Sequence, residues 1–94
     1  MASDDPRIAE LREELTENDV KIVEAVNARL ELVARLKRVK DELGIDFFDP
    51  AREQWLLEHL AERNGGPLSA DGVRELYTTL LDLTKRELGR TDES

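Results

Sequence analysis

The 94-residue sequence contains no cysteine, and its aromatic residues are two phenylalanines, one tryptophan and one tyrosine. Without cysteine the chain forms no disulfide and no thiolate metal site, so a reducing compartment is permitted. So few aromatic residues, beside 38% charged and 39% hydrophobic residues, are typical of solvated amphipathic helices rather than of a β-sandwich. We therefore predict an all-α fold.

Long apolar runs are also missing, and so is an excess of positive charge. No apolar run approaches the roughly 18 residues that a membrane span needs. The N-terminal Met-Ala-Ser-Asp-Asp lacks the basic and apolar regions of a signal peptide. The formal net charge is -8, whereas binding to nucleic acid needs a basic surface. We therefore expect a cytoplasmic protein that binds neither membrane nor nucleic acid.

The first segment, from about residue 6 to residue 43, is typical of one long amphipathic helix. Its apolar residues recur at steps of three, four or seven and are Ile8, Leu11, Leu15, Ile22, Val26, Val33 and Leu36. Proline and glycine are absent from residues 7–43, and Gly44 then provides a C-terminal cap. A helix of roughly 37 residues is about 55 Å long, well beyond the ~30 Å width of a small domain. It needs a partner outside its own protomer.

Two shorter helices are predicted in the rest of the chain. Asp49 and Pro50 are typical of an N-cap and a first helical position, and this second helix would end at about residue 62, before an Asn-Gly-Gly-Pro turn. Ser69 would cap a third helix over about residues 70–88. Short disordered termini are expected at both ends of the chain.

A plain coiled coil is the alternative to this organisation. Asn18, Arg29 and Lys40 place large polar groups in the apolar seam, and a coiled coil tolerates one such residue more readily than three. A monomer of this size would also bury only a little over about 60% of the surface that its unfolded chain exposes. We therefore predict that residues 1–94 form one domain, a three-helix protomer in an intertwined homodimer.

The basic residues of the long helix have a suggestive spacing. Arg29 and Lys40 are eleven positions apart, which places them within roughly 20° of each other on the helix surface. Arg12 precedes Arg29 by seventeen positions, so it is rotated by about 100° and lies about 25 Å away along the axis. In an antiparallel dimer Arg12 could instead serve the site of the partner.

The start of the second helix adds a fourth cation and two carboxylates. Arg52 lies near the positive end of the helix dipole, where a cation gains nothing, so its placement indicates an anion to be bound. Asp49 and Glu53 could accept hydrogen bonds from a substrate hydroxyl. Any one of these residues is more often solvated surface. The combined register of the four cations is more specific than any single position.

With these motifs the sequence resembles the AroQ-class chorismate mutases, from about Ile8 to Leu88. The resemblance is carried by Leu11-Arg12-Glu13, Ala28-Arg29, Lys40 and Asp49-Pro50-Ala51-Arg52-Glu53. It implies an all-helical homodimer that rearranges the dianion chorismate into prephenate. The reaction is unimolecular and pericyclic, so it needs no nucleophile, metal or cofactor, and donors that position and stabilise the substrate suffice.

The resemblance also implies a role for each site residue. Arg12 would reach into the partner's site, Arg29 and Arg52 would hold anionic groups of the substrate, and Lys40 would donate to the ether oxygen. Asp49 and Glu53 would meet the ring hydroxyl. The family has a small hydroxyl residue near the ring carboxylate, and this sequence has Thr84 there.

One position departs from the family pattern. Where the family has a glutamine or glutamate as a second donor to the ether oxygen, an ungapped count gives Leu88. Its neighbour Glu87 lies on an adjoining helix face and could replace it after a small helix shift. Trp55 is expected in the helix interface, with an exposed contact for a partner protein as the alternative. His59 lacks a second histidine as a metal partner and is interpreted as a surface residue.

Two other functions fit the same residues. A mutase or lyase acting on isochorismate or on an amino analogue of chorismate would use the same carboxylate grips. A weakly active helical module that docks on another shikimate-pathway enzyme is the alternative from a different class.

Overall fold

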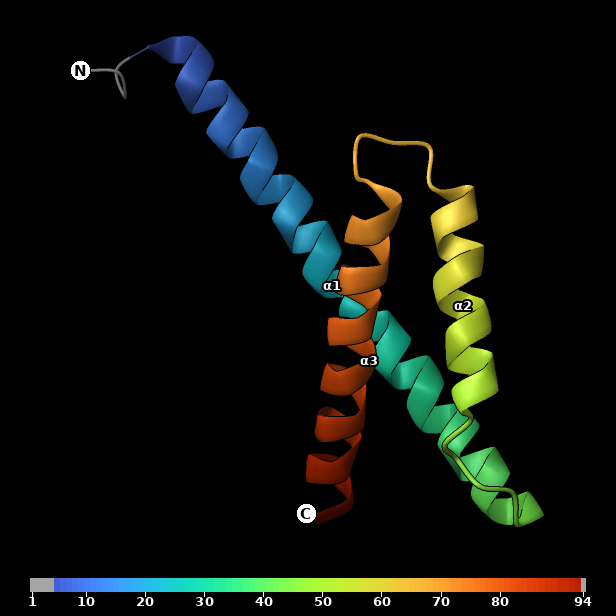
Figure 1. Ribbon diagram of the computed structural model, residues 1–94. Helices are drawn as coiled ribbons and strands as arrows, with labels where there is room; N and C mark the ends of the chain where they lie inside the picture. The colour runs from blue at the N-terminus through green and yellow to red at the C-terminus, as the bar shows by residue number, and fades with distance from the viewer. Residues whose placement is uncertain (1–4, 94) are drawn as a thin grey trace. The chain divides into compact units, whose positions relative to one another are not determined.

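The computed structural model describes residues 5–93, with side chains for residues 5–89. It has the helices α1 (Pro6–Leu43), α2 (Pro50–Arg63) and α3 (Ala70–Glu93), shown in Figure 1. Residues 5–93 contain no strand, so the predicted all-α class is confirmed. The chain divides into two units, Met1–Val33 and Ala34–Ser94. The first holds the N-terminal part of α1, and the second holds its C-terminal end together with α2 and α3.

The beginning of α1 is capped by an aspartate. Oδ1 of Asp5 accepts a hydrogen bond from the backbone N–H of Arg7 at 2.9 Å, and Pro6 occupies the first helical position. The Arg7 guanidinium also donates to Oδ2 of Asp5 at 2.7 Å. The hydrogen bond from the Arg7 side chain lowers the pKa of Asp5 below its usual value, and the hydrogen bond from the Arg7 backbone lowers it further by a smaller amount. The same pair raises the pKa of Arg7.

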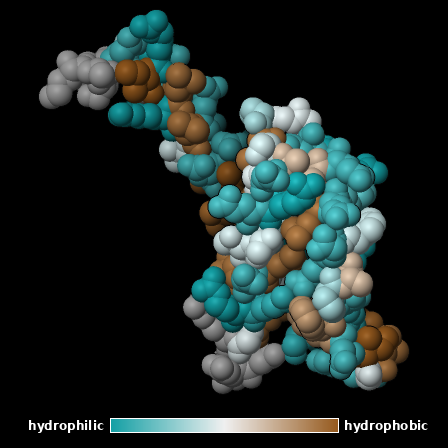
Figure 2. Space-filling view, viewed as in Figure 1, coloured by the Kyte–Doolittle hydropathy of each residue, from teal (hydrophilic) through white to brown (hydrophobic). Residues whose placement is uncertain are grey.

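The first unit leaves its apolar stripe exposed. The side chains of Leu11, Leu15 and Ile22 keep 59%, 60% and 54% of their surface accessible. Figure 2 shows apolar patches between hydrophilic ones along the N-terminal part of α1. None of the residues of α1 is buried in the protomer.

The C-terminal end of α1 is closed by a Schellman turn. Gly44 has a φ of +68°, a conformation that glycine adopts without steric cost. The N–H of Ile45 donates to the Lys40 carbonyl at 2.9 Å, and the N–H of Gly44 donates to the Asp41 carbonyl at 3.2 Å. The chain therefore turns back along the last turn of α1, as the sequence predicted for Gly44.

In the second unit, α2 and α3 pack against each other (Figure 1). Oδ1 of Asp49 accepts from the backbone N–H of Arg52 at 3.1 Å, which caps α2. Oγ of Ser69 accepts from the backbone N–H of Gly72 at 2.9 Å, which caps α3. Both caps were predicted from the sequence. Among residues 5–89 the buried side chains are few, and all belong to α3: Val73, Thr84 and Leu88.

The third helix is longer than the sequence indicated. It was expected to end at about Leu88, but α3 continues to Glu93. Gly89 lies inside it without a positive φ. A single glycine costs a helix about 1 kcal/mol relative to alanine, and no proline follows to stop it. Residues 1–4 and Ser94 lie outside the described part of the chain.

Candidate active site

Lys40 lies in the last turn of α1, where the connection to α2 folds back over it. Its Nζ donates a hydrogen bond to the carbonyl oxygen of Phe47 at 3.2 Å and lies 5.8 Å from the centre of the Phe47 ring. The side chain is half-buried. The Schellman turn at Gly44 reverses the chain and makes this contact possible, so the predicted ether-oxygen donor is held by local backbone structure.

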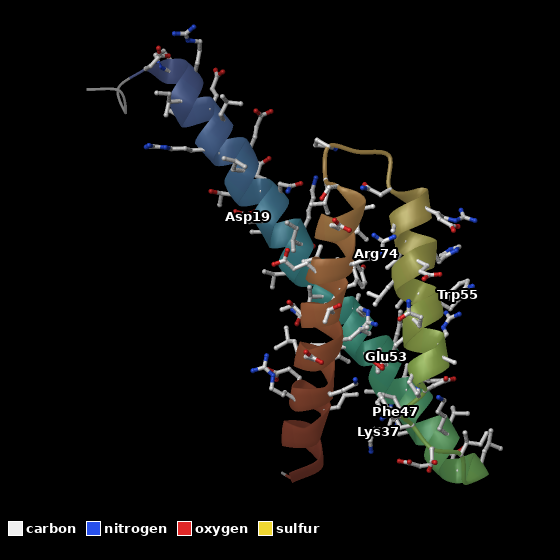
Figure 3. The ribbon with its side chains drawn as sticks, viewed as in Figure 1. Asp19, Lys37, Phe47, Glu53, Trp55 and Arg74 are labelled. Atoms are coloured by element: carbon white, nitrogen blue, oxygen red, sulfur yellow. The ribbon has the colours of Figure 1, made fainter. Side chains whose placement is uncertain are left out.

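Glu53 and Lys85 form an ion pair that joins the first turns of α2 to α3. Nζ of Lys85 lies 2.9 Å from Oε1 of Glu53 and donates to Oε2 at 3.3 Å. The same ammonium lies 4.6 Å from the centre of the Phe48 ring. Figure 3 shows Glu53 on the side of α2 that faces α3. The sequence analysis singled out Glu53 but missed Lys85 and both phenylalanines. The only sequence signal for Lys85 is that it directly follows Thr84, a predicted site residue.

Arg52 belongs to a stack on one face of α2. Its guanidinium carbon lies 4.2 Å from the centre of the Trp55 ring, and Trp55 stacks on His59 with ring centres 4.4 Å apart and planes at 15°. Residues three and four positions apart are neighbours on a helix, which explains the stack. Trp55 keeps 48% of its surface exposed, and Figure 3 shows it on the side of α2 away from α3. Trp55 therefore does not pack between α2 and α3, and the alternative, an exposed contact for a partner protein, stays a prediction.

His59, which stacks on Trp55, is half-buried. In the part of the chain that the structure describes, no group of three histidine, cysteine, aspartate or glutamate residues could hold a metal ion.

In the same part, no helix is long and apolar enough to cross a membrane.

Two of the three predicted site residues of α3 are buried, and the third is half-buried. The side chain of Thr84 is only 4% exposed, and its hydroxyl donates to the Leu80 carbonyl at 2.7 Å. Leu88 is 7% exposed and part of the core, whereas Glu87 is half-buried. The position where the resembled family has a polar donor is therefore an apolar core position here.

The remaining predicted cations belong to the first unit. Arg12 is exposed and Arg29 is half-buried. The use of Arg29 in one site with Lys40 stays a prediction, and so does the use of Arg12 in the site of the partner. A shallow hollow in the same unit is lined by Glu10, Glu13, Glu14 and Glu17. Four carboxylates repel an anionic substrate, so this hollow is no substitute for the cationic cluster.

Comparison with known proteins places these features in a family. A family model described as chorismate mutase type II matches residues 11–87, a range that includes every predicted site residue except Leu88. The bifunctional chorismate mutase/prephenate dehydratase of Pseudomonas aeruginosa is 30% identical over an alignment of 84 residues that covers 84% of this chain. The match spans 23% of that relative, so this chain corresponds to less than a quarter of its length.

Solved structures agree with this match. Chorismate mutase from Thermus thermophilus (form I) is 31% identical, with a TM-score of 0.80 over 83% of this chain and 98% of that one. Its form II is 30% identical, with a TM-score of 0.81 over 85% and 91% of the two chains. The chain belongs to the type II chorismate mutases, a family of all-helical isomerases.

Proposed function

We propose that this chain rearranges chorismate to prephenate in a site built around Lys40. The observation that carries the proposal is the family match over residues 11–87, which contains the whole cationic register of Arg12, Arg29, Lys40 and Arg52. A dianion in a protein of net charge -8 needs such a local concentration of cations.

The reaction breaks the C–O bond of the ether and forms a C–C bond within one molecule. Negative charge grows on the ether oxygen as the C–O bond breaks. An ammonium group has three donors, and Lys40 uses one of them on the neutral carbonyl of Phe47. The backbone therefore orients the ammonium in advance, and its other donors can stabilise the developing charge without a large rearrangement.

The arginines hold the two carboxylates and so fix the reactive conformation. Arg29 and Arg52 would grip them in bidentate fashion. Arg52 lies over the ring of Trp55 in the free protein, and such an exposed cation–π contact contributes only about 0.5–1 kcal/mol. A charge-assisted pair with a substrate carboxylate can replace it. Asp49 and Glu53 would accept hydrogen bonds from the ring hydroxyl, and Thr84 would lie near the ring carboxylate.

The proposed active unit is a homodimer in the cytoplasm, in which Arg12 completes the site of the partner. The exposed stripe that includes Leu11, Leu15 and Ile22 supports this proposal, because large apolar side chains exposed along one helix face indicate a contact with another chain. A second copy of the same helix offers a complementary stripe.

The test is an assay of the purified chain for loss of chorismate and formation of prephenate, with the products separated by chromatography. We expect stoichiometric conversion without added metal or cofactor. Turnover of isochorismate or of an amino analogue in place of chorismate would favour the related enzymes instead. Loss of none of these substrates would contradict the proposal and favour a helical module that docks on a shikimate-pathway enzyme.

A further inference from the structure

Glu53, which is proposed to bind the substrate, forms an ion pair with Lys85. Lys85 is not one of the motif residues on which the family resemblance rests. Lys85 contacts both carboxylate oxygens of Glu53, at 2.9 and 3.3 Å. Its ammonium also lies over the ring of Phe48, 4.6 Å from the ring centre. The ammonium is thus held between a carboxylate from α2 and an aromatic ring from the connection before α2.

This arrangement does little for stability. The side chains of Lys85 and Glu53 are 42% and 22% exposed, and ion pairs with this much solvent contact contribute little to folding. The ion pair instead affects the orientation of the Glu53 carboxylate and its net charge. Two contacts from one ammonium restrict the carboxylate to a narrow range of rotamers, and the positive charge offsets its negative charge.

A site for a dianion needs such an offset. Glu53 is proposed to accept a hydrogen bond from the ring hydroxyl, which brings an anionic side chain close to a substrate with two carboxylates. Like charges at this range repel, and the repulsion weakens substrate binding unless a cation lies beside the carboxylate. Lys85 is the cation that the structure places there.

We propose that Lys85 is a positioning residue for Glu53: it orients the carboxylate and balances its charge, so that a dianionic substrate can bind beside it. The inference rests on the proposed function and adds to it a specificity role for a residue of α3. Lys85 acts through Glu53 and does not itself contact the reacting atoms.

The variant Lys85→Met tests this role, because methionine keeps an unbranched apolar stem beside Phe48 and removes the charge. We expect KM for chorismate to rise about five- to tenfold, while kcat changes less than about threefold, as for a loss of binding that is equal in ground and transition states. Lys85→Arg should keep KM near the wild-type value. Arg86→Met removes an exposed cation from the next position of α3 and is the matched control, with KM unchanged.

Two readouts separate positioning from a structural effect. The rise in KM should shrink in high salt, because salt screens repulsion between exposed charges. In a Glu53→Gln background, Lys85→Met should have little further effect on KM, because the charge that it balances is gone. A rise in KM that is equal in both backgrounds would overturn the proposal.

Circular dichroism and thermal unfolding check that each variant folds, and Lys85→Gln takes the place of Lys85→Met if the latter loses helicity. An active wild-type chain with unchanged KM in Lys85→Met would overturn this assignment alone. An inactive wild-type chain would overturn the proposed function and this assignment with it.

Discussion

Lys40 owes its position to the way its helix ends. Its own carbonyl accepts the N–H of Ile45, and this bond turns the chain so that the carbonyl of Phe47 meets the ammonium of Lys40. One residue therefore closes the helix through its backbone and holds the proposed catalytic donor through its side chain. The donor is in place before substrate arrives, which is what electrostatic stabilisation of a transition state requires.

Lys40→Ala should lower kcat by roughly 10²- to 10³-fold, the loss typical of one donor to a developing negative charge. The helix end should survive, because its hydrogen bonds are made by the backbone. Lys37→Ala is the control. Lys37 lies one turn earlier and pairs with Asp41 at 3.5 Å, and its removal should leave kcat near the wild-type value. Steady-state kinetics of the two variants decide, and equal turnover in wild type and Lys40→Ala would contradict the role.

Replacing Leu88 should change both catalysis and stability. If the ether oxygen lacks a second donor, Leu88→Gln should raise kcat, because a donor that forms mainly in the transition state lowers the barrier selectively. Since Leu88 is only 7% exposed, the new amide should also cost about 1–3 kcal/mol of stability. Both quantities are measurable on one sample, by kinetics and by chemical denaturation.

The companion variant is Glu87→Ala. If Glu87 already supplies the donor, this variant should lose activity and Leu88→Gln should gain little. Unchanged kcat in both would show that this turn of α3 takes no part in the chemistry.

At the scale of the helices, α1 and α2 begin with the same Asp-Pro pair. In each, the aspartate accepts a hydrogen bond from the backbone N–H two or three positions on, and the proline fills the first helical position. At α2 this cap does more, because Asp49 is also a proposed ligand of the ring hydroxyl. On this proposal, one carboxylate would combine a structural role with a role in substrate binding.

Asp49→Ala and Asp49→Ser separate these two roles. Alanine removes both and should destabilise the protein by about 1 kcal/mol, whereas serine is a good N-cap and should restore most of that loss. If the carboxylate also binds substrate, both variants should show a raised KM. If the KM of Asp49→Ser equals that of the wild type, Asp49 caps the helix but does not bind substrate. Thermal unfolding and steady-state kinetics measure the two effects independently.

The first turn of α1 should respond to acid. The pKa of Asp5 is lowered, chiefly by the side chain of Arg7, so its carboxylate stabilises the folded turn above the usual pKa of an aspartate. This contribution is lost as the pH falls through the lowered folded-state pKa. We expect the backbone amide of Arg7 to report the loss in an NMR titration, and Arg7→Ala to move the midpoint back toward the ordinary value. An unshifted midpoint in the wild type would contradict the contact.

The helix starts were predictable because their causes are local. Asp49, Pro50 and Ser69 act within one turn of their own positions, and so does Gly44 at the end of α1. The extension of α3 past Gly89 was not foreseen, since one glycine is too weak a signal to fix a helix end.

The contacts that the sequence missed depend on how separate elements meet. Lys85 and Glu53 are 32 positions apart, and their pairing depends on the register of α3 against α2. Spacing along one helix cannot give that register. Trp55 was misplaced for a related reason: an aromatic residue on an amphipathic helix was assigned to the interface, but neighbours on its own face hold it at the surface.

At the scale of the whole molecule, α1 presents more apolar surface than its own chain covers. Leu32, Leu36 and Val39 continue the exposed series toward the C-terminal end, at 60%, 48% and 49%. A helix with so many exposed apolar side chains favours association in water, because each buried methylene gains about 0.8 kcal/mol. An antiparallel dimer would cover this surface and bring Arg12 of one chain to the site of the other.

Mixing Arg12→Ala chains with Arg29→Ala chains tests the shared site. Each homodimer lacks one cation in both of its sites and should be nearly inactive. In a heterodimer, one site combines an intact Arg29 with an intact Arg12, and the other site lacks both. Random exchange at equal concentrations gives half heterodimers, so about a quarter of the wild-type sites should be restored, as the two-fold symmetry of such a dimer requires.

The matched control mixes Arg29→Ala with Lys40→Ala. These two residues are predicted to serve one site from the same chain, so their heterodimer has one site without Arg29 and one without Lys40, and no activity should return. Native mass spectrometry confirms that the chains have exchanged before each assay. Restoration in the first mixture and not in the second assigns Arg12 to the partner's site. Heterodimers of Arg12→Ala and Arg29→Ala that stay inactive would place Arg12 and Arg29 on one chain's site, and the long helix would then need a different reason for its length.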